Sequence, residues 1–130
     1  MSDRKRLLIT GGAGFIGHHA IDLFLKKTDW EIISLDRLDY SGNLNRVDDV
    51  VRRHDAETRK RVKIVYHDLK AEITQLTSNF IGQVDYIIHM AASSHVDRSI
   101  ENPMEFVLDN VVGTTNILNF ARTQKNLERF

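Results

Sequence analysis

The chain has 130 residues, a length that fits one compact domain, and 42% of them are hydrophobic, enough for a buried core. Its 18 lysines and arginines balance 18 aspartates and glutamates, so no overall charge draws it to nucleic acid or to an anionic membrane. The absence of cysteine excludes disulfides, thiolate metal sites and a cysteine nucleophile, and favours a cytoplasmic location.

Four short apolar runs, rich in isoleucine and valine, alternate with longer segments of helical period. The runs lie at residues 6–10, 31–36, 62–67 and 84–90. This alternation is typical of βαβ units, whose parallel strands form a sheet covered by helices. We therefore expect an α/β fold, a Rossmann-like doubly wound parallel sheet truncated after about four βα units, with residues 1–130 forming one unit. Such sheets bind ligands at the carboxyl ends of their strands.

A glycine-rich turn, Thr-Gly-Gly-Ala-Gly-Phe-Ile-Gly at residues 10–17, joins the first strand to a helix. A dinucleotide site needs a turn residue that tolerates positive φ, a residue without a Cβ beside the diphosphate, and a small residue one helical turn later. Gly11 or Gly12, Gly14 and Gly17 fill these roles in that order. Between a strand and an amphipathic helix, the motif predicts that a diphosphate binds at the helix N-terminus. This helix should begin around Gly14 and bury Ile16, Ala20 and Leu23.

Asp36 ends the second strand, nineteen positions beyond Gly17, close to the offset at which a carboxylate accepts the adenosine ribose hydroxyls. A carboxylate there repels a 2′-phosphate, which favours NAD over NADP. Arg37 either pairs with such a phosphate or is a solvated side chain over the adenine face, and we favour the second reading. The polar stretch that follows predicts a short exposed helix at residues 44–53.

An aspartate after the third strand is a further candidate for contact with the cofactor. Asp68 follows the third strand, where it either accepts from the adenine amino group, with Leu69 against the ring, or is only the N-cap of the next helix. Its place at the same sheet edge as Asp36 favours the contact with adenine.

The last helix has Asn102 as its predicted N-cap, with Pro103 first in the helix and Glu105 completing a capping box. Its predicted core stripe is Val107, Val111, Thr114, Leu118 and Ala121.

The six histidines do not predict a metal site. His18 and His19 are adjacent on a helix and should diverge, and neither H-x-x-x-H nor H-E-x-x-H spacing occurs. His95 either lines an active site or is a loop histidine hydrogen-bonded to backbone, and the residues alone favour the loop.

The fourth strand and the segment after it make the pattern more specific, through the runs at residues 85–100 and 110–114. With the glycine turn, these runs resemble the extended short-chain dehydrogenases, the NAD-dependent epimerase/dehydratase family. The segments at residues 36–43 and 95–100 are most similar to its dTDP-glucose 4,6-dehydratase branch. The resemblance covers nearly the whole chain. It implies NAD as cofactor and a nucleotide sugar, dTDP-glucose, as substrate of the full-length parent.

Motifs and resemblance together predict the cofactor contacts. These are Gly11, Gly14, Phe15, Ile16, Gly17, Asp36, Arg37, Leu38, Asp39, Ser41, Gly42, Asp68, Leu69, Met90, Ala91, Ala92, Ser94 and Asn110. The resemblance also implies substrate contacts at Ser94 and His95. Asn110 matches a helix asparagine that orders the active site, and its plain structural reading is a polar group that holds backbone.

The chain departs from the family pattern at three positions. Ser93 stands where close relatives usually have glutamate, and Asp39 and Asp109 where threonine is common. A carboxylate at Asp109 either weakens cofactor contact or faces water. The resemblance further implies that the family's catalytic residues, with the Tyr-x-x-x-Lys motif, lie beyond Phe130, so we predict no catalytic residue within the chain and binding without turnover.

The parent reaction implied is hydride abstraction from sugar C4 by NAD, loss of water across C5 and C6, and return of the hydride to C6. A nucleotide-sugar epimerase and a non-catalytic dinucleotide-binding module are the alternatives. In the usual strand order the fourth strand is central. We therefore expect its outer edge to be open here, and the chain to be a homo-oligomer.

Overall fold

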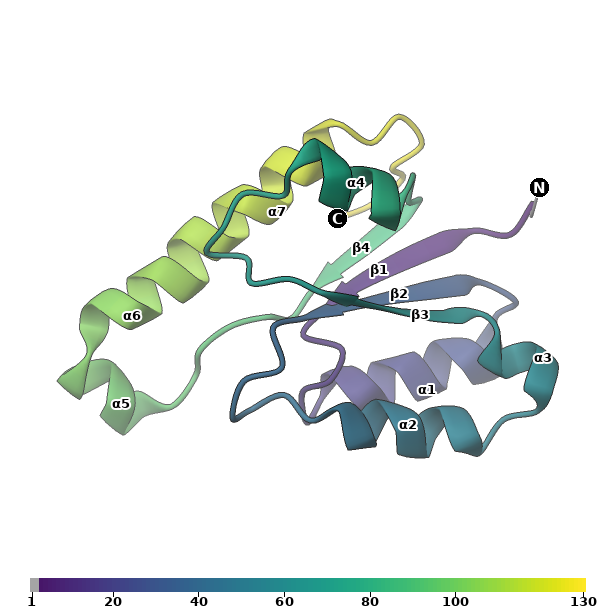
Figure 1. Cartoon of the computed structure of the whole chain (residues 1–130), viewed down its shortest axis with the longest axis horizontal. Coiled ribbons are helices and arrows are strands. Elements are labelled where there is room, and N and C mark those ends of the chain that lie inside the picture. The colour runs from purple at the N-terminus through teal and green to yellow at the C-terminus, as the bar shows by residue number, and fades with distance from the viewer. Residues whose placement is uncertain (1–2) are drawn as a thin grey trace.

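The computed structural model describes residues 3–130 and contains one parallel sheet of four strands (Figure 1). The strands are β1 (Arg6–Thr10), β2 (Glu31–Asp36), β3 (Val62–Tyr66) and β4 (Tyr86–His89), in the order β3-β2-β1-β4. The bounds of β1 and β2 agree with the sequence prediction, whereas β3 and β4 are shorter than predicted. β1 lies between β2 and β4, with Leu8 paired to Ile33 and to Ile87.

Helices cover both faces of the sheet. On one face lie α1 (Gly17–Lys27), α2 (Leu44–Arg52) and the short α3 (Ala56–Arg59). On the other lie α4 (Gln75–Ile81) and a long helical run made of α6 (Pro103–Val107), η1 (Leu108–Val112, a π-helical turn) and α7 (Gly113–Arg122), preceded by α5 (Val96–Glu101). In β1, Leu8 packs into the core under α4 and α7, and Leu7 and Ile9 pack into the core over α1 and α2. The doubly wound α/β fold is confirmed.

The buried face of α1 differs from the prediction. The helix begins at Gly17 and buries Gly17, Ile21 and Leu25. Ile16 is 67% exposed and Leu23 is 53% exposed, so the predicted stripe was wrong at these two positions, whereas Ala20 is partly buried against the core. The periodicity was correct but its phase was not, because Gly17 must face the turn that precedes it.

The last helix buries a different face from the one predicted. Asn102 does precede Pro103 at the N-cap position, but its side chain makes no capping hydrogen bond. The buried side of η1 and α7 contains Asp109, Gly113, Ile117, Phe120 and Ala121. Of the predicted stripe only Ala121 is buried, and Val107, Val111 and Leu118 are exposed. The prediction failed because a hydrophobic pattern does not count an aspartate and a glycine as buried positions.

The predicted helix at residues 44–53 exists as α2, but it is not merely exposed. Asn43 caps it by accepting from the backbone N–H of Asn45. Val47 and Val50 are buried in the core on the α1 side of the sheet. Just before α2, the backbone N–H of Asn43 donates to the carbonyl of Ala13 at 3.0 Å, so this loop is joined to the glycine turn.

Aromatic rings stack at the amino ends of β2 and β4. Trp30 lies parallel to Tyr86, with ring centroids 4.6 Å apart, and Phe24 stacks on the other side of Trp30 at 5.6 Å. The Tyr86 hydroxyl donates to Glu128, which also pairs with Lys5. Nearby, Arg129 forms a parallel bridge to Tyr86 on the outer edge of β4.

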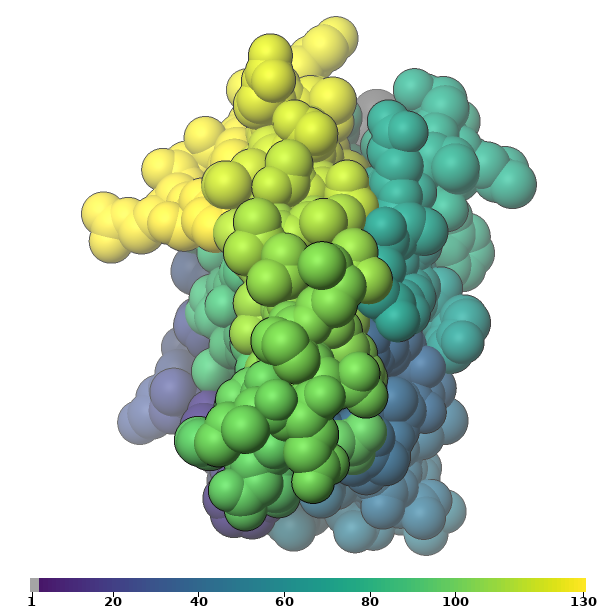
Figure 2. Space-filling model, turned by 90° about the vertical axis from the view of Figure 1, so that its left-hand side faces the viewer, coloured from purple at the N-terminus to yellow at the C-terminus, as the bar shows by residue number. Residues whose placement is uncertain are grey.

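Residues 95–122 form a ridge along one side of the molecule (Figure 2). Its exposed apolar side chains include Val96, Ile100, Met104, Val107 and Val111. Between residues 3 and 130, none of the helices has the length and apolar character needed to span a membrane.

Candidate functional site

A cleft opens at the carboxyl end of the sheet, where the loops after all four strands meet. It holds about 620 Å³ of free space, including solvent at its mouth. Most of the predicted cofactor residues line it, namely Gly11, Gly14, Asp36, Arg37, Asp39, Ser41, Gly42, Asp68, Leu69, Met90, Ala91 and Ala92. The lining does not include Phe15, Ile16, Gly17, Leu38, Ser94 and Asn110. For lining and non-lining residues alike, contact with a cofactor stays a prediction.

The glycines of the turn have separate tasks. Gly11 takes the positive φ of +73°. At Gly17, a Cβ would lie 2.1 Å from the Gly11 carbonyl oxygen, and at Gly12 it would lie 2.0 Å from the Ser34 hydroxyl, so both glycines are required by packing. At Gly14, a Cβ would meet only the Gly11 carbonyl oxygen, at 3.1 Å, and would otherwise face the cleft. Gly14 is thus the position where missing side-chain volume leaves room for a ligand.

The N-terminus of α1 provides donors for an anion beside Gly14. The backbone N–H groups of Phe15 and Ile16 take part in none of the hydrogen bonds between described residues. Free N–H groups and the positive end of the helix dipole together favour a phosphate. The side chains of Phe15 and Ile16 are exposed to solvent.

Asp36 shapes the cleft through backbone hydrogen bonds. Its carboxylate accepts from the N–H of Leu38 at 2.7 Å and from the N–H of Ala13 at 3.2 Å. Leu38 has a φ of +56°, in the left-handed region that non-glycine residues rarely adopt. Asp36 therefore joins the loop after β2 to the glycine turn and holds Leu38 in a strained conformation.

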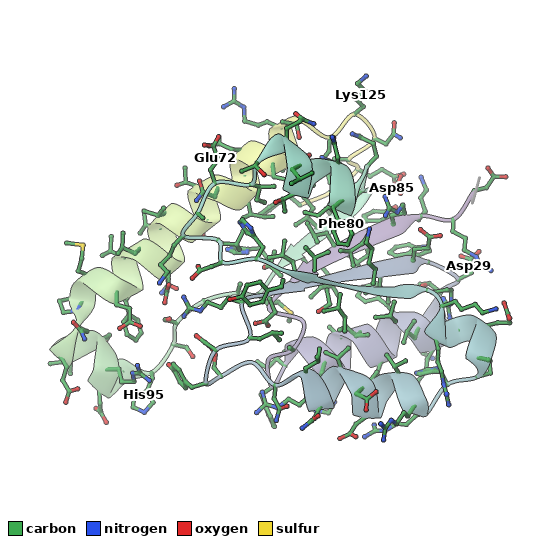
Figure 3. All side chains as sticks on the ribbon, viewed as in Figure 1. Asp29, Glu72, Phe80, Asp85, His95 and Lys125 are labelled. Carbon is green, nitrogen blue, oxygen red and sulfur yellow. The ribbon has the colours of Figure 1, made fainter. Side chains whose placement is uncertain are left out.

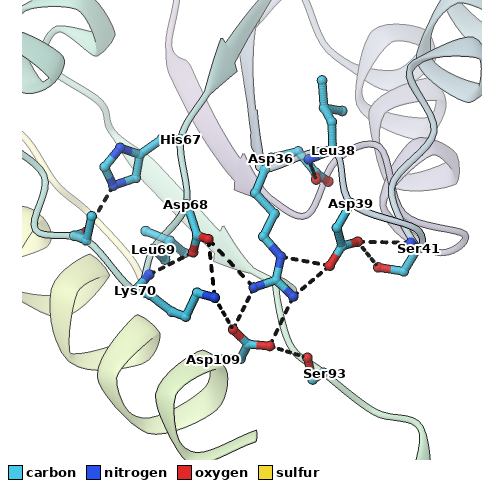
Figure 4. Close-up of polar contacts among 12 residues, drawn as sticks. Asp36, Leu38, Asp39, Ser41, His67, Asp68, Leu69, Lys70, Ser93 and Asp109 are labelled. Atoms are coloured by element: carbon cyan, nitrogen blue, oxygen red, sulfur yellow. Dashed lines mark hydrogen bonds and ion pairs between the residues drawn. The ribbon is translucent and has the colours of Figure 1, made fainter. Parts of the chain in front are cut away.

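Arg37 is an ion-paired residue in the wall of the cleft, and the prediction of a solvated side chain was wrong. Its guanidinium donates to both carboxylate oxygens of Asp109, at 2.6 and 3.0 Å, and its Nε donates to Asp39 at 2.7 Å (Figure 4). Asp68 lies 3.9 Å away on the same side. The hydrogen bonds that Arg37 donates to Asp109 outweigh burial and raise the pKa of Arg37 well above its usual range.

Asp109 does not face water, so that reading was wrong, and the reading that it weakens cofactor contact stays a prediction. Only 5% of its side-chain surface is exposed. It accepts from the Ser93 hydroxyl at 2.5 Å as well as from Arg37. Burial alone would raise the pKa of Asp109, but the hydrogen bonds from Arg37 and Ser93 lower it. Asp109 therefore fixes the long helix to both the β2 and β4 loops.

The loop after β3 also lines the cleft, beside Arg37. Asp68 accepts from the backbone N–H of Lys70 at 3.0 Å, which makes a local turn. Its reading as a helix N-cap was wrong, because α4 begins only at Gln75 and is capped by Thr74. Leu69 is buried and lines the cleft beside Asp68, as a contact with a flat ring would require.

The loop after β4 is held by an amide from the long helix. Asn110 accepts from the backbone N–H of Ser93 at 2.8 Å and donates to its carbonyl at 2.9 Å. Its reading as a polar group that holds backbone is thus confirmed. His95 is the N-cap of α5 (Figure 3), and its Nδ1 accepts from the N–H of Arg98 at 3.4 Å. The reading of His95 as hydrogen-bonded to backbone is confirmed, and a substrate contact at Ser94 or His95 stays a prediction.

Sequence reasoning left five lining residues out of the predicted contacts: Leu35, His67, Lys70, Ser93 and Asp109. His67 and Lys70 lie within two residues of Asp68 in the sequence, and this closeness could have predicted that both line the cleft. The pairing of Asp109 with Arg37 joins residues 72 positions apart, and no local pattern announces it.

His18 and His19 do not diverge as predicted. Their ring centroids lie 4.0 Å apart, and Phe15 packs edge-on against both rings. Within the described part of the chain, no group of three or more histidine and acidic side chains is placed to hold a metal ion.

The profile of the family described as GDP-mannose 4,6 dehydratase matches residues 8–130. The chain belongs to this family. A dTDP-glucose 4,6-dehydratase from Salmonella typhimurium is 39% identical over 119 residues, which are 90% of this chain. The chain spans 31% of the length of that relative.

Solved structures of dehydratases and epimerases share the fold. A dTDP-glucose 4,6-dehydratase from Streptomyces venezuelae, solved with NAD bound, is 39% identical and has a TM-score of 0.75; the match covers 89% of this chain and 35% of that one. A UDP-Glc/GlcNAc 4-epimerase from Campylobacter jejuni is 32% identical, with a TM-score of 0.78 over 94% of this chain and 35% of that one. An epimerase and a dehydratase are thus similar to this chain in structure to nearly the same degree.

Proposed function

We propose that the cleft binds NAD and that the chain is the cofactor-binding part of a nucleotide-sugar 4,6-dehydratase. The observation that carries this proposal is the glycine turn, where Gly14 opens on the cleft at the N-terminus of α1. The Streptomyces dehydratase, solved with NAD bound, supports the choice of cofactor.

The residues fit a dinucleotide in an extended pose. The diphosphate lies against Gly14 and the free N–H groups of Phe15 and Ile16. The adenosine ribose lies near Asp36, and adenine lies between Arg37 and Leu69. The nicotinamide half follows Met90, Ala91 and Ala92. When bound, NAD accepts and returns a hydride; the chain's own residues position it and exclude water from its adenosine end.

The charges of the cleft favour NAD over NADP. Its lining contains the carboxylates Asp36, Asp39, Asp68 and Asp109, against the cations Arg37 and Lys70. A 2′-phosphate needs a free guanidinium, but the donors of Arg37 already bind Asp39 and Asp109. A 2′-phosphate would therefore meet uncompensated carboxylates.

The finer proposal is that the parent protein converts dTDP-glucose to its 4-keto-6-deoxy product. It is supported by the 39% identity to the Salmonella dehydratase. An epimerase acting on a UDP-sugar is the second candidate, favoured by the TM-score of 0.78 to the Campylobacter enzyme. A cytoplasmic location and assembly into homo-oligomers belong to the same proposal.

Calorimetric titration tests the proposal. NAD, NADP, dTDP-glucose and UDP-glucose are titrated into the chain, and turnover of each sugar is assayed with NAD present. We expect NAD to bind more tightly than NADP, with no turnover. Tighter binding of NADP, or no binding of either dinucleotide, would reject the cofactor assignment; a preference for UDP-glucose would favour the epimerase.

A further inference from the structure

The hydroxyl of Thr10 joins the end of β1 to the loop after β4. Thr10 is fully buried at the end of β1, next to the glycine turn. Its Oγ1 lies 3.0 Å from the N–H of Met90 and 3.2 Å from the N–H of Ala91, the first two residues after β4. The third neighbour of this oxygen is Nδ1 of His89, at 2.7 Å.

The chemistry of these groups fixes the direction of every hydrogen bond. Backbone N–H groups can only donate, so the two amides occupy the acceptor capacity of the Thr10 hydroxyl. The N–H of Met90 also donates to the Thr10 carbonyl, whereas the N–H of Ala91 donates to the Thr10 hydroxyl alone. The single hydroxyl hydrogen must therefore point at His89, and Nδ1 of His89 must accept it. If Nδ1 carried a hydrogen, the hydrogen of the Thr10 hydroxyl would have no acceptor, and Oγ1 would face a third donor besides the two amides.

The other ring nitrogen completes the arrangement. With Nδ1 unprotonated, Nε2 of neutral His89 carries the hydrogen and donates to the Thr114 hydroxyl in α7, 3.0 Å away. The groups facing the ring are the Thr10 and Thr114 hydroxyls and the Phe130 ring, whose centroid is 6.2 Å away. Among the described residues, no charged side chain pairs with His89, and burial lowers its pKa.

The loop held by Thr10 is part of the cleft wall. Met90, Ala91 and Ala92 line the cleft, and the backbone N of Ala91 lies only 3.0 Å from where a Cβ on Gly11 would be. A shift of Ala91 would therefore change the position of the glycine turn as well.

We propose that His89 is a positioning residue, whose neutral Nε2–H form orients the Thr10 hydroxyl to hold the Met90 and Ala91 amides and so sets the cleft wall. Protonation of His89 removes the acceptor, turns the Thr10 hydroxyl away from at least one amide, and loosens this wall. The statement that the wall contacts the nicotinamide half of NAD rests on the proposed function; the hydrogen-bond arrangement does not.

Nuclear magnetic resonance of the chain without ligand tests the arrangement directly. Long-range proton–nitrogen spectra identify the tautomer of His89, and amide shifts of Met90 and Ala91 are followed as the pH falls from about 8 to about 5. We expect the Nε2–H form at high pH, and amide shifts that follow the protonation of His89. An Nδ1–H tautomer, or amides that do not respond when the ring protonates, would overturn the proposal.

Variants separate positioning from mere packing. His89→Asn keeps an acceptor near Nδ1 but cannot titrate, so the pH dependence of both amides should vanish while the shifts stay near those of neutral His89. Thr10→Ser keeps the hydroxyl and should behave as the native chain. Thr10→Val keeps the shape without the hydroxyl and should bind NAD about tenfold more weakly, the factor for the ~1.4 kcal/mol of a lost buried hydrogen bond. Equal NAD affinity in Thr10→Val and Thr10→Ser would contradict the role in the cleft.

The two proposals fail in different ways. If the native chain binds no NAD, the proposed function fails, and the tautomer and amide shifts still decide the role of His89. If NAD binds but the tautomer is Nδ1–H, only the inference about His89 is wrong.

Discussion

The carboxylate of Asp109 and the guanidinium of Arg37 form a bidentate ion pair, with oxygen–nitrogen distances of 2.6 and 3.0 Å. It connects the π-helical turn in the long helix to the loop after β2. Parallel N–H···O bonds of this kind fix the orientation of both groups as well as adding attraction. One side of the cleft is thus held by a charge pair that joins two layers of the fold.

Removing this pair should change the choice between the two dinucleotides. In Asp109→Asn the guanidinium of Arg37 loses one carboxylate and becomes available to a 2′-phosphate. We expect the preference for NAD over NADP to shrink by about tenfold, equivalent to ~1.4 kcal/mol. Calorimetry with both cofactors measures the ratio. Asp48→Asn, which removes only an exposed pair with Arg52, is the matched control. An unchanged ratio would mean that Arg37 plays no part in the selection.

Acid should destabilise the chain through the same carboxylates. Burial raises the pKa values of Asp109 and Asp39, but their hydrogen bonds lower them below the ordinary value of 3.8. A depressed carboxyl pKa adds stability that is present above the unfolded value and is lost as the pH falls through the folded value. Urea unfolding between about pH 6 and pH 2 should show this loss beginning near pH 4. The Asp109→Asn variant should show a shallower dependence, and a parallel curve would refute the assignment.

Gly14 and Gly17 should respond differently to added side chains. Gly14→Val should abolish NAD binding with little loss of helix content, because its side chain enters the cleft. Gly17→Ala should cost at least about 2 kcal/mol of folding stability, because its Cβ would lie 2.1 Å from the Gly11 carbonyl oxygen. Circular dichroism and calorimetry on both variants check the contrast. Native affinity in Gly14→Val would make the turn purely structural.

Asp36→Ala should weaken NAD binding and narrow the gap to NADP. The variant loses an acceptor for the ribose and also the hydrogen bonds to Leu38 and Ala13, so Leu38 loses its support at φ +56°. Asp36→Asn keeps an acceptor oxygen without the charge, which separates the shape of the loop from repulsion of a phosphate. If both variants bind NAD as the native chain does, Asp36 does not contact the ribose.

The ridge of residues 95–122 should take part in self-association. Val96, Ile100 and Met104 are 65–75% exposed on it, and exposed apolar patches mark sites of protein–protein contact. The outer edge of β4 is bridged by Arg129 at its amino end. Light scattering should detect dimers or larger species, and Ile100→Glu should reduce them. A monodisperse monomer at high concentration would contradict this expectation.

The sequence was sufficient to predict the strands, their order and the glycine turn, because period and spacing are local properties. It was insufficient where a polar group is buried by a distant partner. Asp109 and Gly113 face the core, so the apolar stripe of the last helix was assigned to the wrong side. Arg37 was predicted to be solvated because two of its three carboxylate neighbours are distant in sequence, Asp68 in the loop after β3 and Asp109 in η1. In the cleft, residues that belong to a local motif could be predicted, but ion pairs between distant elements could not.

The stack of Trp30 on Tyr86 gives the chain a built-in optical reporter. Trp30 is the single tryptophan, and it lies at the amino end of β2, whereas the cleft lies at the carboxyl end. A strand of this length spans roughly 20 Å. Its fluorescence should change sharply when the aromatic stack opens on unfolding. A ligand in the cleft should leave that emission spectrum almost unaltered, so tryptophan fluorescence can follow unfolding in variants whose binding has changed.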